Sequence, residues 1–409
     1  MSSIFLNVHF LLVAATNFCL FLIVATWSFL PVVIVEMGGD KAEVGMVMGS
    51  LGITSLGSLP FVAPLIDRWG RKFFMVSGIL LMGLTNGGFM LFDHYSPLMI
   101  GVRLLQGLAF AACFNACATS VVDLVPAHKR AQGIGLFGVS GSLAVSVGPY
   151  IGETCLLTWG RDAYFLLMMG FGLLGFLLAL LVREPERKNS GATTIQGFFP
   201  TAARDGHLGM MTTAVIFGSG FAAMTTFFPL LARDLGLRAG IFFVCYGLTL
   251  ILVRFLLGTL ADSLNRDRLI FACLLGFGVM LAATSGISSM TQTMFLGALF
   301  GLVQGLSYPA MMANMVDRSN DQNRAVVVAL FTGSFGVGIN VSVLAWGFIA
   351  KTQGLPFMFL AAALLVFAVA GLHAFLGLSR SAESSSSWGL VASRQRTVNV
   401  SRRARTSSR

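Results

Sequence analysis

Long apolar stretches recur along almost the whole chain, and this pattern constrains the fold more than any other feature. A helix needs about 20 predominantly apolar residues to cross the hydrocarbon core of a bilayer. Only 11% of the residues are charged, whereas soluble domains carry about 25%. A large soluble core would interrupt the apolar runs with charge more often, so the pattern favours an integral membrane protein.

The apolar stretches predict twelve spans, separated by short polar links. The first stretch has no Lys or Arg before it and is longer than the core of a signal peptide, so we interpret it as a span. The predicted spans lie near residues 8–35, 43–66, 73–92, 97–122, 131–153, 161–182, 207–232, 239–261, 268–288, 291–316, 324–350 and 355–378. The sequence therefore predicts an all-α membrane protein with twelve transmembrane helices.

The longest link, residues 183–206, divides six spans from six. We expect residues 1–182 to form an N-terminal six-helix half and residues 207–378 a C-terminal six-helix half. Residues 183–206 are then a central cytoplasmic loop. Residues 379–409 are rich in Ser and Arg and predict a disordered, basic tail.

The distribution of Lys and Arg predicts the orientation, because cytoplasmic loops carry an excess of these residues. With both termini in the cytoplasm, thirteen basic residues lie in inner loops and seven in the tail, against five outside. The five are Lys41, Arg161, Arg233, Arg238 and Lys351. Basic loops beside anionic lipid account for the formal charge of +10 without nucleic acid. We predict a multi-pass cell-membrane protein, in the inner membrane of a bacterium.

Short sequence elements recur at matching places in the two halves. They are Asp67 and Arg71 against Asp262 and Arg266, Asp123 and Arg130 against Asp317 and Arg324, and Gln106-Gly107-Leu108 against Gln304-Gly305-Leu306. Two six-helix repeats of parallel topology imply a pseudo-two-fold axis along the membrane normal. The expected solute site is a cavity near the midplane between the halves.

Two motifs carry a resemblance to a known family. Asp67-Arg68-Trp69-Gly70-Arg71-Lys72 follows the second span, with Ala63 where the family usually has Gly. Arg103-Leu104-Leu105-Gln106-Gly107 in span four fits the pattern R-x-x-Q-G. In this order, at these helix ends, both motifs resemble those of the major facilitator superfamily. The resemblance covers essentially the full length and implies a transporter that works by alternating access.

A third motif lies in span five and consists of Gly135, Ala144, Gly148-Pro149, Gly152 and Glu153. It resembles the G-x8-G-x3-G-P-x2-G-G pattern of exporters that exchange substrate for protons, with departures at Ala144 and Glu153. The resemblance favours proton-coupled efflux of a drug-like compound or metabolite, with an organic anion as one candidate. Proton-coupled uptake is the alternative.

The same resemblance implies roles for individual residues. The expected gating residues are Asp67, Arg68, Gly70, Arg71, Asp123, Asp262, Arg266 and Asp317. Asp67 is expected to contact the N-terminal amides of span eleven, and Arg71 and Arg266 to pair with Asp123 and Asp317. Arg103 is assigned to proton coupling, with Glu153 as a boundary acid that can titrate. Gly148 and Pro149 are expected to bend span five.

Arg103 and Arg254 are the Lys or Arg residues that fall inside the predicted spans. A charge in hydrocarbon costs a few kcal/mol, so each should face a partner or a wet cavity. Arg254 is an anion-binding candidate, and structural hydrogen bonding to carbonyl groups is the alternative. Other candidates for the substrate site are Asn17, Asn115, Tyr308 and Asn340, although each is more often an interhelical hydrogen bond.

Other classes of function find little support. No G-x-x-x-x-G-K-[ST] phosphate loop is present, nor H-E-x-x-H or G-x-S-x-G. A membrane-embedded hydrolase and a non-transporting receptor are distant alternatives. We therefore expect no catalytic residues, no metal and no cofactor. The expected partners are a small solute, protons and the bilayer, and the protein is expected to be a monomer.

Overall fold

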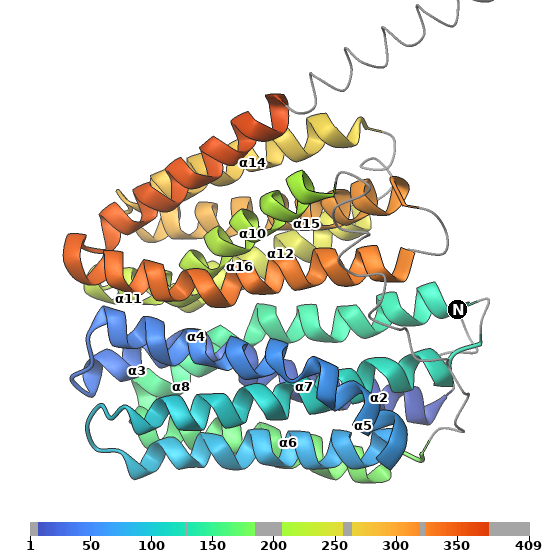
Figure 1. Cartoon of the computed structure of the whole chain (residues 1–409). Coiled ribbons are helices and arrows are strands. Elements are labelled where there is room, and N and C mark those ends of the chain that lie inside the picture. The colour runs from blue at the N-terminus through green and yellow to red at the C-terminus, as the bar shows by residue number, and fades with distance from the viewer. Residues whose placement is uncertain (1–6, 127–128, 185–206, 257–263, 320–323, 376–409) are drawn as a thin grey trace, which may run out of the picture.

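The computed structural model describes residues 7–126, 129–184, 207–256, 264–319 and 324–375. In this part of the chain the regular structure is helical, and the long helices lie roughly parallel to one another (Figure 1). The helices from the first part of the chain form one layer, blue to green, and those from the second part lie beside it, yellow to red (Figure 1).

The N-terminal half contains the first six predicted spans. Its elements are α2 (Val8–Thr26), η1 (Trp27–Phe29), α3 (Leu30–Glu36), α4 (Lys41–Gly57), α5 (Leu59–Trp69), α6 (Arg71–Gly88), η2 (Phe89–Leu91), α7 (Leu98–Leu124) and α8 (Arg130–Leu181). Helices α4 and α5 form one bent span, with an angle of 53° between them. Pro60 follows the break and has no N–H to continue the helical hydrogen bonds of α4.

The C-terminal half contains the remaining six. Its elements are α10 (Leu208–Ala222), the π-helical turn η5 (Ala223–Phe227), α11 (Phe228–Asp234), α12 (Ala239–Leu256), α14 (Arg266–Thr284), α15 (Met290–Asp317), α16 (Arg324–Gln353) and a last helix, Leu355–Phe375. The π-helical turn interrupts the seventh span where η1 interrupts the first, and a proline follows in both, Pro31 and Pro229.

The described helices supply twelve membrane-crossing segments, as predicted. Ten helical stretches are long and apolar enough to cross a membrane, and the bent pair of α4 and α5 makes an eleventh. One of the ten, Gln132–Leu181, has 50 residues, about twice the length of a span. Gly160 breaks it with φ 82° and ψ −173°, which separates spans five and six.

Within each half, small residues let the helices approach closely. A Cβ built at Gly172 would lie 2.4 Å from the Cα of Gly83, so α8 and α6 touch backbone to backbone. A Cβ at Gly107 would lie 2.2 Å from Thr54 Oγ1, so α7 needs a glycine where it crosses α4. Such contacts substitute for the hydrophobic driving force that lipid removes.

Candidate functional site

Helices α8 and α12, one from each half, contact each other along a line of residues. At one end, Arg238 Nε lies 2.8 Å from Glu153 Oε2, and Arg238 Nη2 donates to the Thr154 hydroxyl at 3.1 Å. The Glu153 side chain is only 5% exposed. Further along, a Cβ built at Gly247 would lie 1.9 Å from Ser146 Oγ. The α8–α12 interface therefore requires glycine on α12 and holds a buried carboxylate at its end.

Helices α4 and α16 form the second interface between the halves. A Cβ built at Gly45 would lie 2.7 Å from the carbonyl oxygen of Val343, and one at Gly52 would lie 2.1 Å from the Cβ of Asn340. Glycines on α4 therefore leave room for groups of α16, just as Gly247 on α12 leaves room for Ser146 on α8.

Asp40 begins α4 and also contacts the other half. Its carboxylate accepts hydrogen bonds from the amides of Ala42 and Glu43 at 2.8 and 2.9 Å, and Glu43 accepts from the Asp40 amide at 2.7 Å. Lys351 Nζ lies 2.6 Å from Asp40 Oδ2. Burial raises the pKa of the Asp40 carboxyl, but hydrogen bonds from Lys351 and from the two amides outweigh it and lower that pKa below 3.8.

Three ion pairs thus join the halves at one end of the bundle. They are Glu153–Arg238, Asp40–Lys351 and Glu36–Arg233, the last at 3.3 Å. We call this end, with the turn between α3 and α4, the Asp40 end. The opposite end, with the turn between α5 and α6, is the Asp67 end.

The α8–α12 interface stops part-way toward the Asp67 end. Its described contacts reach as far as the hydrogen bond from Arg254 Nη1 to Ser142 Oγ, at 3.0 Å. One turn further on the same face of α8, a Cβ built at Gly138 would meet no described atom within 4 Å, and the same holds at Gly135.

The α4–α16 interface stops in the same way. A Cβ built at Gly336 would lie 3.4 Å from Leu56, but one at Gly333, a turn further along α16, would meet no described atom within 4 Å. Helix α5 then turns aside and packs against α6 and α7. The described residues of the two halves therefore touch at the Asp40 end and separate toward the Asp67 end.

The Asp67 end of the N-terminal half contains the pair expected from the sequence. Arg71 forms an ion pair with Asp123, and Arg71 Nη1 donates to the carbonyl oxygen of Thr119 at 3.1 Å. Asp67 interacts electrostatically with Arg71 and is exposed, as is Arg68. The expected contact of Asp67 with α16 is not found among the described residues. The reason is that α5, which carries Asp67, packs against α6 and α7 of its own half.

Glu184, directly after span six, caps the helix that follows the Asp67 motif. Its carboxylate accepts hydrogen bonds from the amides of Arg71 and Lys72 at 2.7 and 2.9 Å, where the helix dipole favours negative charge. Gly70 has φ +98°, and a Cβ there would lie 2.9 Å from Glu184 Oε1. Glycine is required at Gly70 for both reasons. Glu184 was not predicted from the sequence. It could have been noticed as an acidic residue directly after span six, in a stretch that is otherwise rich in basic residues.

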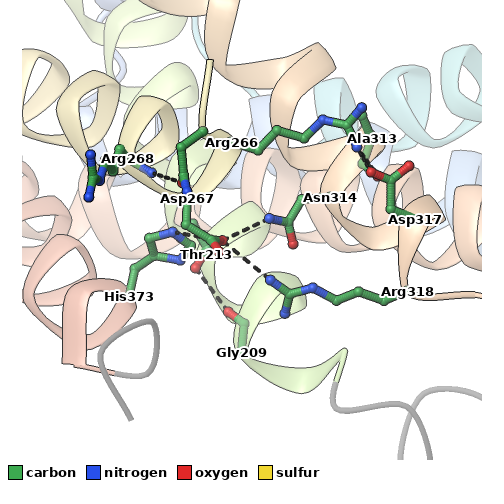
Figure 2. Close-up of polar contacts among 11 residues, drawn as sticks. Gly209, Thr213, Arg266, Asp267, Arg268, Ala313, Asn314, Asp317, Arg318 and His373 are labelled. Atoms are coloured by element: carbon green, nitrogen blue, oxygen red, sulfur yellow. Dashed lines mark hydrogen bonds and ion pairs between the residues drawn. The ribbon is translucent and has the colours of Figure 1, made fainter. Parts of the chain in front are cut away.

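The C-terminal half repeats the first ion pair (Figure 2). Arg266 pairs with Asp317, and its Nη1 lies 3.5 Å from the carbonyl oxygen of Ala313. The Asp317 side chain is 58% exposed, against 5% for Asp123, so the two pairs differ in solvation. The remaining expected gating residue of this half, Asp262, lies outside the described residues.

Asp267 gathers polar groups from two further helices (Figure 2). Asn314 Nδ2 donates to Asp267 Oδ1 at 2.8 Å, Arg318 Nη2 lies 3.3 Å from that oxygen, and His373 Nε2 lies 3.8 Å from it. Asp267 thereby ties the last helix and α15 to the start of α14. Sequence reasoning missed this cluster, although His373 was visible as a polar residue deep in the last span.

Arg103 is 2% exposed and lies inside the N-terminal half. Its Nη1 donates to Gln106 Oε1 at 2.8 Å, and its guanidinium carbon lies 4.1 Å from the centre of the Trp27 ring. Asn86 Oδ1 accepts from Trp27 Nε1 at 2.9 Å and from Gln106 Nε2 at 3.3 Å. Amide oxygens and a ring face surround this cation, and the described network contains no carboxylate. The R-x-x-Q-G motif therefore joins α7 to α6 and to the first span.

Arg254 lies near the place where the α8–α12 contacts end. Its side chain is exposed and donates a hydrogen bond to Ser142 Oγ of the other half at 3.0 Å. Tyr308, another predicted substrate residue, lies in the same half as Arg254 and packs against Phe331 and Phe335.

The three asparagines proposed for the substrate site bond mainly to other helical groups. Asn17 is 1% exposed and donates to Ser140 Oγ at 2.9 Å, so it forms an interhelical contact within one half. Asn115 and Asn340 donate to carbonyl oxygens one turn earlier in their own helices. For these residues the structure favours the alternative reading, interhelical or local hydrogen bonding.

The glycines of span five pack against the first span. A Cβ built at Gly148 would lie 2.8 Å from the Ala25 Cβ, and one at Gly152 would lie 2.7 Å from Thr26 Cγ2. The non-helical backbone inside α8 is at Gly160, not at Pro149. Gly148 thus allows span five to approach the first span closely, and the chain stays helical through Pro149.

The sequence profile described as Major Facilitator Superfamily matches residues 12–242 and 210–406. The chain belongs to the major facilitator superfamily. Major facilitator proteins are transporters, and the fold and the two repeated motifs described above agree with this membership. The expected family, fold class and multi-pass membrane character are thereby confirmed.

Individual relatives are distant. The staphylopine export protein of Staphylococcus aureus is 21% identical over 83% of this chain and 89% of its own length. The multi-drug resistance efflux pump PmrA of Streptococcus pneumoniae is 24% identical over 83% of this chain and 88% of its own. The crystal structure of the nucleoside transporter NupG has a TM-score of 0.74 at 14% identity, and the match covers 90% of this chain and 98% of NupG. Structural likeness at this identity supports the fold alone.

Proposed function

We propose that this major facilitator exports a small organic solute in exchange for protons, by alternating access. The observation that carries the proposal is the pair of interfaces, α8–α12 and α4–α16, whose contacts among the described residues lie at the Asp40 end and extend part-way along the bundle. With the orientation predicted from the basic residues, the Asp40 end faces the outside and the Asp67 end the cytoplasm. This arrangement is an inward-facing state, which accepts solute from the cytoplasm, the first step of export.

The opposite state requires the Asp67 end to close. The ion pairs there, Arg71–Asp123 and Arg266–Asp317, each lie within one half. We infer that they stiffen the two inner loops rather than hold the halves together. Closing this end would bring Asp67 toward the N-terminal amides of α16, which favour a carboxylate.

Glu153 is the acid best placed for proton coupling. It is buried and paired with Arg238, so it must be ionised for the Asp40 end to be held by this pair. A proton on Glu153 would remove the charge and leave Arg238 without its partner, which favours an open Asp40 end. Proton uptake from outside and solute release to the outside are thereby linked to the same conformation, and exchange then requires that Glu153 pass its proton toward the cytoplasm before the pair with Arg238 forms again. Arg103 has no acid in its described network, so we assign it an indirect part in coupling, through the packing of α6 and α7.

Efflux is favoured over uptake by the span-five motif and by similarity to two proteins named as exporters. The test uses purified protein in liposomes that contain a pH-sensitive dye. A panel of aromatic carboxylates, nucleosides and lipophilic cations is added under an imposed pH gradient. Exchange predicts that solute flux and proton flux run in opposite directions, whereas uptake by symport predicts the same direction. Solute flux that ignores the pH gradient would contradict proton coupling.

The orientation is tested separately. A cysteine in place of the exposed His94, at the Asp40 end, should react from outside intact cells with a membrane-impermeant thiol reagent in a cysteine-free background. A cysteine in place of the exposed Arg268, at the Asp67 end, should not react. The reverse pattern would overturn the export reading of this conformation.

A further inference from the structure

Arg254 differs from other arginines at the helix ends and interfaces. Arg71, Arg238, Arg266 and Arg318 each pair with a carboxylate. Among the described residues Arg254 pairs with none, and its one hydrogen bond there goes to the neutral hydroxyl of Ser142. A guanidinium group has five N–H donors, and this one is exposed where the contacts between the halves end. A charge within a membrane span commonly marks a substrate or ion pathway, and no described acid pairs with this one.

An aromatic group of the N-terminal half lies next to this position. Its members are Phe21, Phe110, Phe114 and Phe137, with ring centres 5.5 to 6.2 Å apart. A Cβ built at Gly141, the neighbour of Ser142, would lie 3.5 Å from the Phe21 ring. Phe21, Phe110 and Phe114 are only partly buried, so this group offers apolar surface beside the residue that Arg254 contacts.

A second aromatic group lies in the C-terminal half. Tyr308 packs against Phe331 and Phe335, with ring centres 5.0 and 5.2 Å apart. Tyr308 follows Gln304 by four residues, as Phe110 follows Gln106, so the two groups occupy equivalent positions in the repeat. Arg254 therefore contacts Ser142 beside the aromatic surface of the N-terminal half, and the repeat supplies an equivalent aromatic surface in its own half.

We propose that Arg254 is the anion-recognition residue of the solute site, and that the solute is an organic anion with an aromatic or other flat apolar body. This inference rests on the proposed transport function and names its substrate class. The guanidinium binds a carboxylate or sulfonate through two parallel hydrogen bonds, which Lys cannot reproduce. Ser142 adds a hydroxyl from the other half, and the aromatic rings receive the body of the solute.

Binding to the purified protein in detergent tests this inference without any transport. The probes are matched pairs: 1-naphthoate and 1-naphthamide, indole-3-acetate and indole-3-acetamide, and naphthalene-1-sulfonate and its sulfonamide. We expect at least one anion to bind the parent protein about tenfold or more tightly than its neutral partner. Arg254→Ala should weaken that anion roughly 10- to 100-fold, as loss of a charged hydrogen-bond partner does. It should leave the neutral partner within about twofold.

Two further variants define the result. Arg254→Lys keeps the charge and should still weaken the anion about tenfold, because the two-point contact is lost. Arg268→Ala removes an exposed arginine at the Asp67 end and should bind the anion as the parent does. The inference is overturned if no anion is preferred over its neutral partner, or if Arg254→Ala binds the anion as tightly as the parent.

Failure of this inference and failure of the proposed function are distinguishable. Proton-driven export of neutral or cationic solutes, with no anion preference, would leave the function standing and overturn the role of Arg254. Anion binding that depends on Arg254, with no proton-linked flux in liposomes, would support the role of Arg254 and contradict the proposed transport function.

Discussion

Arg238 Nε lies 2.8 Å from Glu153 Oε2, and this ion pair connects two halves that are separated by the central link of the chain. The carboxylate is 5% exposed and the guanidinium 41%. Protonation of the buried partner therefore leaves a cation that solvent can still stabilise, so the pair can open without trapping an unpaired charge in the interior.

Glu153→Gln should imitate the protonated state. Gln keeps the shape and an acceptor oxygen but removes the charge that holds Arg238, so the closed Asp40 end becomes less stable. We expect the dependence of solute flux on external pH to be flattened, measured in liposomes between pH 5 and 8. Asp162→Asn is the matched control, because Asp162 is an exposed acid at the same end that pairs with Arg161 in its own half. Unchanged pH dependence in Glu153→Gln would remove Glu153 from the coupling mechanism.

The Asp40–Lys351 pair should give a pH-dependent contribution to stability in acid. The pKa of Asp40 is lowered in the folded state, so its stabilisation is complete above 3.8 and is lost as the pH falls through the folded pKa. Lys351→Gln should lower the melting temperature at pH 7, and the difference from the parent should shrink to nothing as the pH is taken below that pKa. Melting curves in detergent from pH 7 to 2.5 measure it. A difference that grows as the pH falls has the wrong sign for this account.

Gly247→Ala should force α8 and α12 apart. The new Cβ would lie 1.9 Å from Ser146 Oγ and 2.7 Å from the Ser146 Cα, so a side-chain rotation cannot relieve the overlap. Overpacking of this kind costs about 1–3 kcal/mol, which shifts the balance away from the state closed at the Asp40 end by roughly 5- to 150-fold. Spin labels at His94 and Thr291, which are exposed at that end in opposite halves, should report longer distances.

The control for that variant is Gly138→Ala. Gly138 lies on the face of α8 that carries Ser146, but a Cβ built there meets no described atom within 4 Å. It should leave the label distances of the parent unchanged. Equal effects of Gly247→Ala and Gly138→Ala would mean that helix propensity, not the interface, accounts for both.

Arg71→Ala should destabilise the protein more than Arg266→Ala does. The two arginines occupy equivalent positions in the repeat, but Asp123 is 5% exposed and Asp317 is 58% exposed. Removing the partner of a buried carboxylate costs about 3–5 kcal/mol, whereas an exposed pair contributes about 0–1 kcal/mol. Adding Asp123→Asn to Arg71→Ala should recover part of the loss. Equal melting temperatures for Arg71→Ala and Arg266→Ala would show that the difference in burial has no energetic effect.

The parts of the fold that depend on local pattern were predictable. Span length follows from bilayer thickness, so twelve spans could be placed without knowing any contact. The pairs Arg71–Asp123 and Arg266–Asp317 could be predicted because the motifs that contain these residues have the same spacing in both halves. Equal spacing in two repeats implies that both pairs form in the same way.

Contacts that depend on how helices are rotated about their axes were not predictable. Glu153 was recognised as an acid near a membrane boundary, but its pairing with Arg238 requires that both face the same line between α8 and α12. Asn17 is polar within an apolar span, and its hydrogen bond to Ser140 likewise depends on how the first span is rotated. Glu184 and Asp267 act on helix ends that become their neighbours only after the bundle has assembled.

The two interfaces between the halves run for similar lengths, about 15 residues of helix on α12 and on α16, or roughly 23 Å at 1.5 Å per residue. Two parallel lines of contact that stop at comparable depth leave the halves one easy relative motion. That motion is a rotation about an axis in the membrane plane, passing near Ser142 and Leu56. A single line of contact would also permit a twist about the membrane normal, which would open a side path to lipid. The duplicated interface thus favours this rotation over a twist of one half against the other.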